Sequence, residues 1–322
     1  MKRRPNRIVN YLIYAMVRLI VGLAQTMSID QSYSFARTLA AVLYRVDKRH
    51  RKIGIENLRQ AFGDQYTEAD RDRIVRGVYR HFSMMLMEIL HIPRKLHPET
   101  WRDRITLVGH EKVIDRLLQG GPLIMLTGHF GNWEMAGYLF GVFGFPPNSV
   151  ARTLDNPYLD RFLKSFRERT GQKMIAKKGG YDEMLEVLRT GGVLSFLADQ
   201  DAGERGMFVD FFGRPASTHK AIALMAIEHK APVVVGYARR IGPGFRYEVG
   251  CTELFDPDEW TGTADDARLL TQRYTSALEQ IIRRDPEQYL WLHRRWKHQP
   301  KARRPRNHVD VVANQPVPQA AR

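Results

Sequence analysis

The stretch Leu123-Ile-Met-Leu-Thr-Gly-His-Phe-Gly-Asn-Trp-Glu134 organises this chain. Its first four residues are apolar, and the run is short enough for a buried strand. Residues 127–132 are turn formers, and an apolar helical pattern follows from Trp133 to Phe143. The stretch therefore predicts a strand, a tight turn that carries His129, and a helix whose first turn contains Glu134. In open α/β sheets, ligand sites form at such strand ends.

The spacing of His129 and Glu134 limits how the two side chains can meet. On a single helix, five residues turn through about 500°, so the side chains would diverge by about 140°. They meet only if His129 lies in the turn and Glu134 in the first helical turn. Glu134 would then bond one imidazole nitrogen and leave the other as a general base. The alternative is a capping His and a Glu that interacts with the helix dipole; the stretch by itself leaves both open.

Strand and helix patterns alternate from residue 107 to residue 251. This alternation predicts an α/β fold with a mixed, largely parallel central sheet flanked by helices. Three expected strands end in polar residues, at His129, Arg152 and Asp199. Because the carboxyl ends of parallel strands share one edge of a sheet, we expect these groups to converge. Residues 203–213 are expected to form a loop, with Ser217 and Thr218 capping the helix that follows.

The net charge of +15 lies at the two ends of the sequence. Residues 1–52 contain eleven Lys and Arg against two Asp (+9), residues 289–322 contain eight against one (+7), and the middle carries −1. Basic ends suit an anionic lipid surface or a nucleic acid. A solvated, solubilising surface is the alternative for such charge blocks.

The run from Ile8 to Ala24 is mostly apolar and follows a basic segment. It is slightly shorter than the roughly 20 residues of a spanning helix, and Arg18 lies near its middle. We therefore expect an N-terminal membrane-associated helix, lying in the interface rather than spanning, within residues 1–27. A core helix is the alternative. Residues 28–300 are expected to form the main domain, and residues 301–322 a basic, disordered tail.

The sequence lacks the motifs of several function classes. The chain contains no G-x-G-x-x-G, P-loop or G-x-S-x-G motif, which argues against dinucleotide, nucleotide and serine-hydrolase sites. Its one cysteine, Cys251, cannot form an intrachain disulfide. No Cys/His group has zinc-ligand spacing, and we expect neither a metal nor a cofactor.

The motif His129-Phe-Gly-Asn-Trp-Glu134 resembles the His-x4-acid motif of glycerolipid-type acyltransferases. The chain most resembles the branch that adds secondary lauroyl and myristoyl chains to lipid A, over about residues 5–300. Further segments carry this resemblance: Asn57-Leu58 with Ala61-Phe62, Val150-Ala-Arg152 with Asp155-Asn-Pro, Ala198-Asp-Gln-Asp201, and Glu287-Gln-Tyr-Leu-Trp-Leu-His-Arg-Arg-Trp296. Thr153-Leu154 departs from a Pro that many members have after the Arg.

The resemblance implies transfer of a fatty acyl chain from acyl carrier protein or acyl-CoA to a hydroxyl of a lipid A precursor or related glycolipid. It implies a bacterial enzyme on the cytoplasmic face of the inner membrane, with no nucleic acid partner. His129 would be the general base and Glu134 its partner. Arg152, Arg167 and Arg169 are candidates for an acidic substrate group, and Asp199 is a site acid of unassigned role.

Three alternatives remain open at this point. The same chemistry would serve another acceptor, such as a phosphoinositol mannoside. A metal-dependent hydrolase would use His129, Glu134, Asp199 and Asp201. A non-catalytic binder of membranes or nucleic acid would use only the basic ends.

Overall fold

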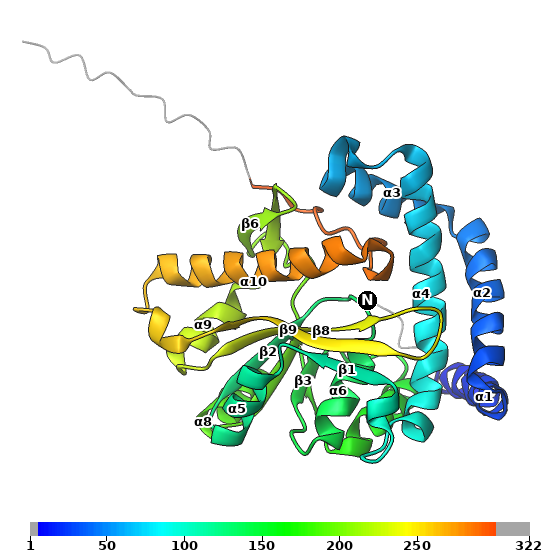
Figure 1. The fold of residues 1–322 in the computed structure, drawn as a ribbon, viewed down its shortest axis with the longest axis horizontal. Helices are drawn as coiled ribbons and strands as arrows, with labels where there is room; N and C mark the ends of the chain where they lie inside the picture. The colour runs from blue at the N-terminus through cyan, green and yellow to red at the C-terminus, as the bar shows by residue number, and fades with distance from the viewer. Residues whose placement is uncertain (1–5, 301–322) are drawn as a thin grey trace, which may run out of the picture.

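The computed structural model describes residues 6–300, which form one seven-stranded sheet and a separate hairpin with helices around them (Figure 1). The sheet order is β1-β9-β8-β2-β5-β3-β4. The strands are β1 (Ile105–Val108), β2 (Leu123–Thr127), β3 (Asn148–Ala151), β4 (Lys173–Ala176), β5 (Val193–Leu197), β6 (Met207–Phe211), β7 (Arg214–Thr218), β8 (Val233–Arg240) and β9 (Tyr247–Phe255). The α-helices are α1 (Arg7–Thr26), α2 (Ile29–Val46), α3 (Lys48–Phe62), α4 (Glu68–Lys95), α5 (Glu111–Gln119), α6 (Trp133–Val142), α7 (Pro157–Arg167), α8 (Tyr181–Arg189), α9 (Lys220–Glu228) and α10 (Ala264–Arg284). The expected tail, residues 301–322, lies outside the described residues.

The predicted mixed, largely parallel sheet is confirmed. Strand β2 pairs in parallel with β5 and β8, while β3 pairs in parallel with β5 and β4. Strand β9 runs antiparallel to β8, and β1 runs parallel to β9. The carboxyl ends of β8, β2, β5, β3 and β4 therefore share one edge, where the segments after β2, β3 and β5 begin.

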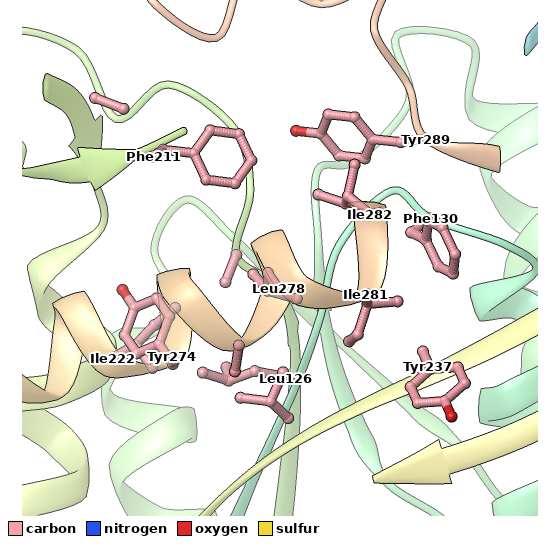
Figure 2. Packing of buried hydrophobic residues seen from close by; sticks show 14 of the residues in the cluster. Leu126, Phe130, Phe211, Ile222, Tyr237, Tyr274, Leu278, Ile281, Ile282 and Tyr289 are labelled. Carbon is pink, nitrogen blue, oxygen red and sulfur yellow. The ribbon is translucent and has the colours of Figure 1, made fainter. Parts of the chain in front are cut away.

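The two faces of the sheet are covered by different helices. On one face, Leu126 of β2 points toward Leu278 and Ile281 of α10 (Figure 2). The alternate residue Leu123 packs with Val113 of α5 on the other face. This alternation follows from the period of two along a strand. Because both faces are buried, the parallel strands are apolar almost throughout.

An N-terminal layer of helices lies beside the carboxyl edge of the sheet (Figure 1). Helix α4 is its longest member and begins at a capping box formed by Thr67 and Asp70, as the Thr67-Glu-Ala-Asp pattern predicts. Along its apolar stripe, Ile74, Val78 and Met85 are buried, and Phe82 and Ile89 are half-buried. Helix α2 packs along α4, so side chains from α4 reach both α2 and the sheet.

Helix α1 differs from the other helices because its apolar side chains are largely exposed. Leu12 is 61% exposed and Leu19 is 66% exposed. Among the described residues it is the one helix that is long and apolar enough to cross a membrane, by length and composition. Its aromatic side chains Tyr11 and Tyr14 contact Tyr158 of α7, so α1 is also attached to the body of the protein.

The prediction of a loop over residues 203–213 was wrong for residues 207–211, which form strand β6. Strands β6 and β7 form an antiparallel hairpin there, turned at Phe212 and Gly213, which both have positive φ. Aromatic residues such as Phe211 supply the buried face of this hairpin. Ser217 and Thr218 therefore belong to β7, and His219 takes the position before α9.

Candidate active site

The turn between β2 and α6 is held in place by backbone hydrogen bonds from two sides. The amide of Asn132 donates to the carbonyl of Ala238 in β8, and the amide of Gly131 donates to the carbonyl of Gln288. Gly131 has a φ of +59°, and a Cβ at this position would lie 1.8 Å from the oxygen of Ala238. The turn therefore requires glycine at 131, both for its conformation and for the close approach of β8.

His129 and Asp199 form a hydrogen-bonded pair at the ends of neighbouring strands. Imidazole Nδ1 lies 2.8 Å from Oδ1 of Asp199, and the His129 amide donates to Oδ2 at 2.9 Å. The Asp199 side chain is only 3% exposed and that of His129 is 16% exposed. The predicted convergence of these two strand ends is thus confirmed.

The pair stabilises the charged form of both groups. Burial alone would lower the pKa of His129, but the Asp199 carboxylate outweighs burial and raises that pKa above its usual value. Burial would likewise raise the pKa of Asp199, yet His129 holds it below its usual range. With Nδ1–H donated to the carboxylate, Nε2 is the nitrogen that can accept a proton. It forms a long hydrogen bond with the side-chain Nε2 of Gln200, at 3.4 Å.

Glu134 takes a different partner from the one expected. Its carboxylate accepts two hydrogen bonds from the guanidinium of Arg167, one of them from Nε at 2.8 Å, and a third from the Trp133 indole at 3.1 Å. The expected hydrogen bond between Glu134 and the imidazole is therefore not formed, because Asp199 is the partner of Nδ1. Glu134 lies in the first turn of α6, as predicted, but faces α7. Its charge still contributes to the raised pKa of His129.

The remaining predicted site residues lie apart from this pair. Arg152 is 73% exposed at the end of β3 and pairs with Asp155 at 3.2 Å. Arg169 is exposed in the short 3-10 helix that follows α7. The Asp201 side chain is 8% exposed and pairs with His298 at 2.6 Å. Of the three arginines, the structure brings only Arg167 into the neighbourhood of His129, through Glu134.

A buried polar network behind the turn was missed by the sequence analysis. Its centre is Glu88 of α4, which is fully buried and accepts a hydrogen bond from Arg240 of β8 at 2.8 Å. A signal was present, because His81, Glu88 and His91 recur with helical spacing on the buried face of α4. Polar residues on a core face mark a network, since buried polar groups need partners.

An apolar cavity of about 420 Å³ lies between the sheet and helices α5 and α6. Thr127, Trp133 and Glu134 line it next to the His129 turn. Further lining residues come from the sheet and from the helices, among them Val113, Phe140, Phe196 and Val249. The cavity therefore offers an apolar compartment next to the turn that carries His129.

Metal-ligand geometry is not found in the part of the chain that the structure describes. Over residues 6–300, no group of three or more His, Cys, Asp or Glu side chains is placed to hold a metal ion. The three acids and the histidine of the hydrolase alternative are divided among the His129–Asp199, Glu134–Arg167 and Asp201–His298 pairs.

Comparison with known proteins decides the family. The sequence profile described as bacterial lipid A biosynthesis acyltransferase matches residues 2–298. The chain belongs to this family. It is therefore an acyltransferase of the lipid A type, and the resemblance carried by the His129 motif is confirmed.

Individual lipid A acyltransferases match over most of the chain. It is 28% identical to a lipid A biosynthesis lauroyltransferase of Escherichia coli (strain K12), over 84% of this chain and 86% of the relative. It is 25% identical to a lipid A biosynthesis acyltransferase of Haemophilus influenzae, over 76% and 75%. A phosphatidylinositol mannoside acyltransferase of Mycobacterium tuberculosis is also 25% identical, over 65% of this chain and 66% of the relative.

Proposed function

We propose that this acyltransferase moves a fatty acyl chain from acyl carrier protein or acyl-CoA to a hydroxyl of a lipid A precursor or related glycolipid, with His129 as general base. The observation that carries the proposal is the His129–Asp199 pair, which uses Nδ1 and leaves Nε2 as the proton acceptor, in a turn whose neighbours Thr127 and Trp133 line an apolar cavity. An alcohol is a poor nucleophile at neutral pH, so a base positioned in this way supports the reaction.

The proposed step uses the two nitrogens of His129 differently. Nε2 takes the proton of the acceptor hydroxyl while the hydroxyl oxygen attacks the thioester carbonyl. Asp199 stabilises the resulting imidazolium through Nδ1. The C–S bond then breaks, the new ester C–O bond remains, and the imidazolium returns its proton to the leaving thiolate. A base of this kind typically accelerates a reaction by roughly 10²–10⁴-fold.

In this proposal Glu134 and Arg167 form one wall of the donor site rather than the proton path. Glu134 is the acid of the His-x4-acid motif, and its ion pair with Arg167 lines the cavity next to Trp133. Because Arg167 is already engaged, Arg152 and Arg169 are the exposed cations that we propose for an acidic group of the acceptor. Asp199 orients the base and is not assigned to substrate binding.

The apolar cavity suits the acyl chain of the donor. Its lining is mostly aliphatic and aromatic side chains. Each methylene that moves from water into such a site contributes about 0.8 kcal/mol. A chain held there would place its thioester near the turn that carries His129.

Helix α1 supports a membrane location on the cytoplasmic face of the bacterial inner membrane. Its exposed apolar side chains follow a basic segment, which suits an anionic lipid surface. Replacing Leu12, Leu19 and Leu23 by Glu is expected to release the protein from anionic vesicles in sedimentation assays. Unchanged sedimentation would overturn α1 as the anchor.

The reaction is tested by transfer of a radiolabelled acyl chain to purified acceptors. His129→Ala is expected to abolish transfer while leaving vesicle binding intact, because α1 is distant in sequence from the turn. His97→Ala is the matched control, since His97 is exposed and far from β2 in sequence. Near-wild-type turnover by His129→Ala would contradict the mechanism.

A phosphoinositol mannoside acceptor is the second candidate, favoured by the match to the mycobacterial relative of that name. Parallel assays with a lipid A precursor and a phosphoinositol mannoside separate the two acceptors. Mass spectrometry of host lipids with and without the gene identifies the product formed in cells. Loss of activity on adding a chelator would instead favour the metal-dependent hydrolase.

A further inference from the structure

Glu88 is a buried carboxylate that the proposed reaction does not use. Its two oxygens accept four hydrogen bonds, from the Tyr33 hydroxyl at 2.6 Å, Arg240 Nε at 2.8 Å, Asn132 Nδ2 at 2.9 Å and the Tyr247 hydroxyl. These donors come from α2, from β8 and β9, and from the turn that follows His129. One side chain thus joins the helical layer, the sheet and the catalytic turn.

Asn132 carries this connection into the active site. Its Nδ2 donates to Glu88, while its Oδ1 accepts from the amide of Met135 at 3.0 Å and so caps α6. The orientation of Asn132 therefore sets both the end of the turn and the start of the helix that carries Glu134. Asn132 itself is fully buried, so water does not compete for these bonds.

His81 forms a second connection from α4 to the same turn. Its Nε2 lies 3.0 Å from the carbonyl oxygen of Gly131, and its Nδ1 lies 2.9 Å from Nη1 of Arg240. Burial and the neighbouring Arg240 lower the pKa of His81 to about 3, so the ring is neutral at pH 7. Because Nδ1 accepts from Arg240, the proton lies on Nε2 and is donated to Gly131.

We propose that Glu88 is a positioning residue, which holds the 129–132 turn through Asn132 and through Arg240 and His81, so that His129 stays paired with Asp199. Besides the backbone hydrogen bonds to Gln288 and Ala238, the turn is attached through the Asn132 side chain and the Gly131 carbonyl, and both attachments lead to α4. Glu88, whose two oxygens accept four hydrogen bonds, supplies a fixed reference for the turn. The effect on kcat that this inference predicts rests on the proposed function.

Asn132→Ser is the sharpest variant. Serine is a good N-cap and retains an oxygen for the Met135 amide, but it lacks the donor that reaches Glu88. We expect kcat to fall roughly tenfold to a hundredfold, because small displacements of reacting groups have effects of that size. The KM for the donor should change by less than about twofold, since the cavity is unaltered.

Ser32→Ala is the matched control. Ser32 lies in α2 and its hydroxyl is 2.9 Å from His91 of α4, so the pair is buried between the same two helices. His91 lies one helical turn from Glu88 along α4, and neither Ser32 nor His91 forms a hydrogen bond with the 129–132 turn among the described residues. We expect Ser32→Ala to lower the melting temperature without lowering kcat, which separates positioning from general stability.

Glu88→Gln and the double variant with Asn132→Ser test whether the two residues act together. If Glu88 acts through Asn132, the loss of kcat in the double variant will be smaller than the product of the two single losses. Multiplicative losses would overturn this route. If Glu88→Gln does not fold, Asn132→Ser and its control decide the question.

A structural measurement makes the inference testable without activity. The Nδ1 proton shared by His129 and Asp199 is expected to give a low-field NMR signal, which should shift or vanish in Asn132→Ser but persist in Ser32→Ala. An unchanged signal and kcat in Asn132→Ser would overturn the positioning role, as would equal losses in both variants. If the wild-type protein transfers no acyl group to any acceptor, the proposed function fails, and the NMR signal alone decides the role of Glu88.

Discussion

The buried carboxylates of Asp199 and Glu88 both bind the 129–132 turn, and they differ in the chemistry of the partners that they bind. Asp199 accepts a hydrogen bond from Nδ1 of His129, and Nε2 of the same ring lies 3.4 Å from Nε2 of Gln200. Glu88 accepts four hydrogen bonds, and its partner Arg240 is buried with it. We propose proton transfer for the first pair and positioning for the second. Burial and perturbed pKa values therefore do not distinguish a site from a scaffold. The difference is that residues next to His129 line an apolar cavity, whose lining does not include Glu88.

Asp199→Asn should give the largest effect. Loss of the carboxylate removes the group that fixes the imidazole tautomer, so kcat should fall by about 10³-fold. Asp199 raises the pKa of His129, and the base must be unprotonated to act. The acid limb of the kcat/KM profile of the variant should therefore move to lower pH. A pH-rate profile of both proteins checks the shift, and an unmoved acid limb would contradict the pairing.

Glu88→Gln should act on stability as well as on rate. It leaves Arg240 as an uncompensated buried charge, which typically costs about 3–5 kcal/mol. Hydrogen bonds and the neighbouring guanidinium lower the pKa of Glu88 against the opposing effect of burial. Its contribution is therefore present above the unfolded-state pKa and is lost as pH falls through the folded-state pKa. Denaturant unfolding at pH 7 and at pH 3 should show a smaller pH effect in the variant than in the wild type.

Ala136→Phe should narrow the cavity and shorten the preferred acyl chain. Ala136 lies in α6 and lines the cavity. Each methylene excluded from an apolar site costs about 0.8 kcal/mol, which is roughly fourfold in kcat/KM. Competition between donors of different chain length measures the change. An equal loss for all lengths would indicate damage to the turn instead of a filled cavity.

Arg152→Ala should have the smallest effect on folding, because its pair with Asp155 is exposed. Such surface pairs contribute roughly 0–1 kcal/mol, so the melting temperature should hardly change. If Arg152 binds an acidic acceptor group, the KM for the acceptor will rise while the KM for the donor stays constant. Unchanged values for both substrates would remove Arg152 from the site.

The α/β class, the parallel strands and the edge that carries His129 and Asp199 were predictable from the sequence. Strand length, alternation with helices and the polar residues after each strand are local patterns, and parallel pairing then places the strand ends together. The hairpin at β6 and β7 was not predicted, because its glycines and aromatics match both a loop and a short hairpin. The start of α4 at Thr67 was predicted, since its capping box is a local signal.

The family was determined by the sequence itself, through an ordered set of short motifs, and the same motifs predicted a candidate site at residues 129–134. Only the tertiary structure decided which acid meets which base. Asp199 is 70 residues from His129, and Arg167 is 33 residues from Glu134. Hydrogen bonds between distant segments depend on how α6, α7 and β5 pack. The five-residue spacing in the sequence therefore suggested that His129 and Glu134 form a pair. In the folded protein His129 instead binds Asp199, and Glu134 binds Arg167.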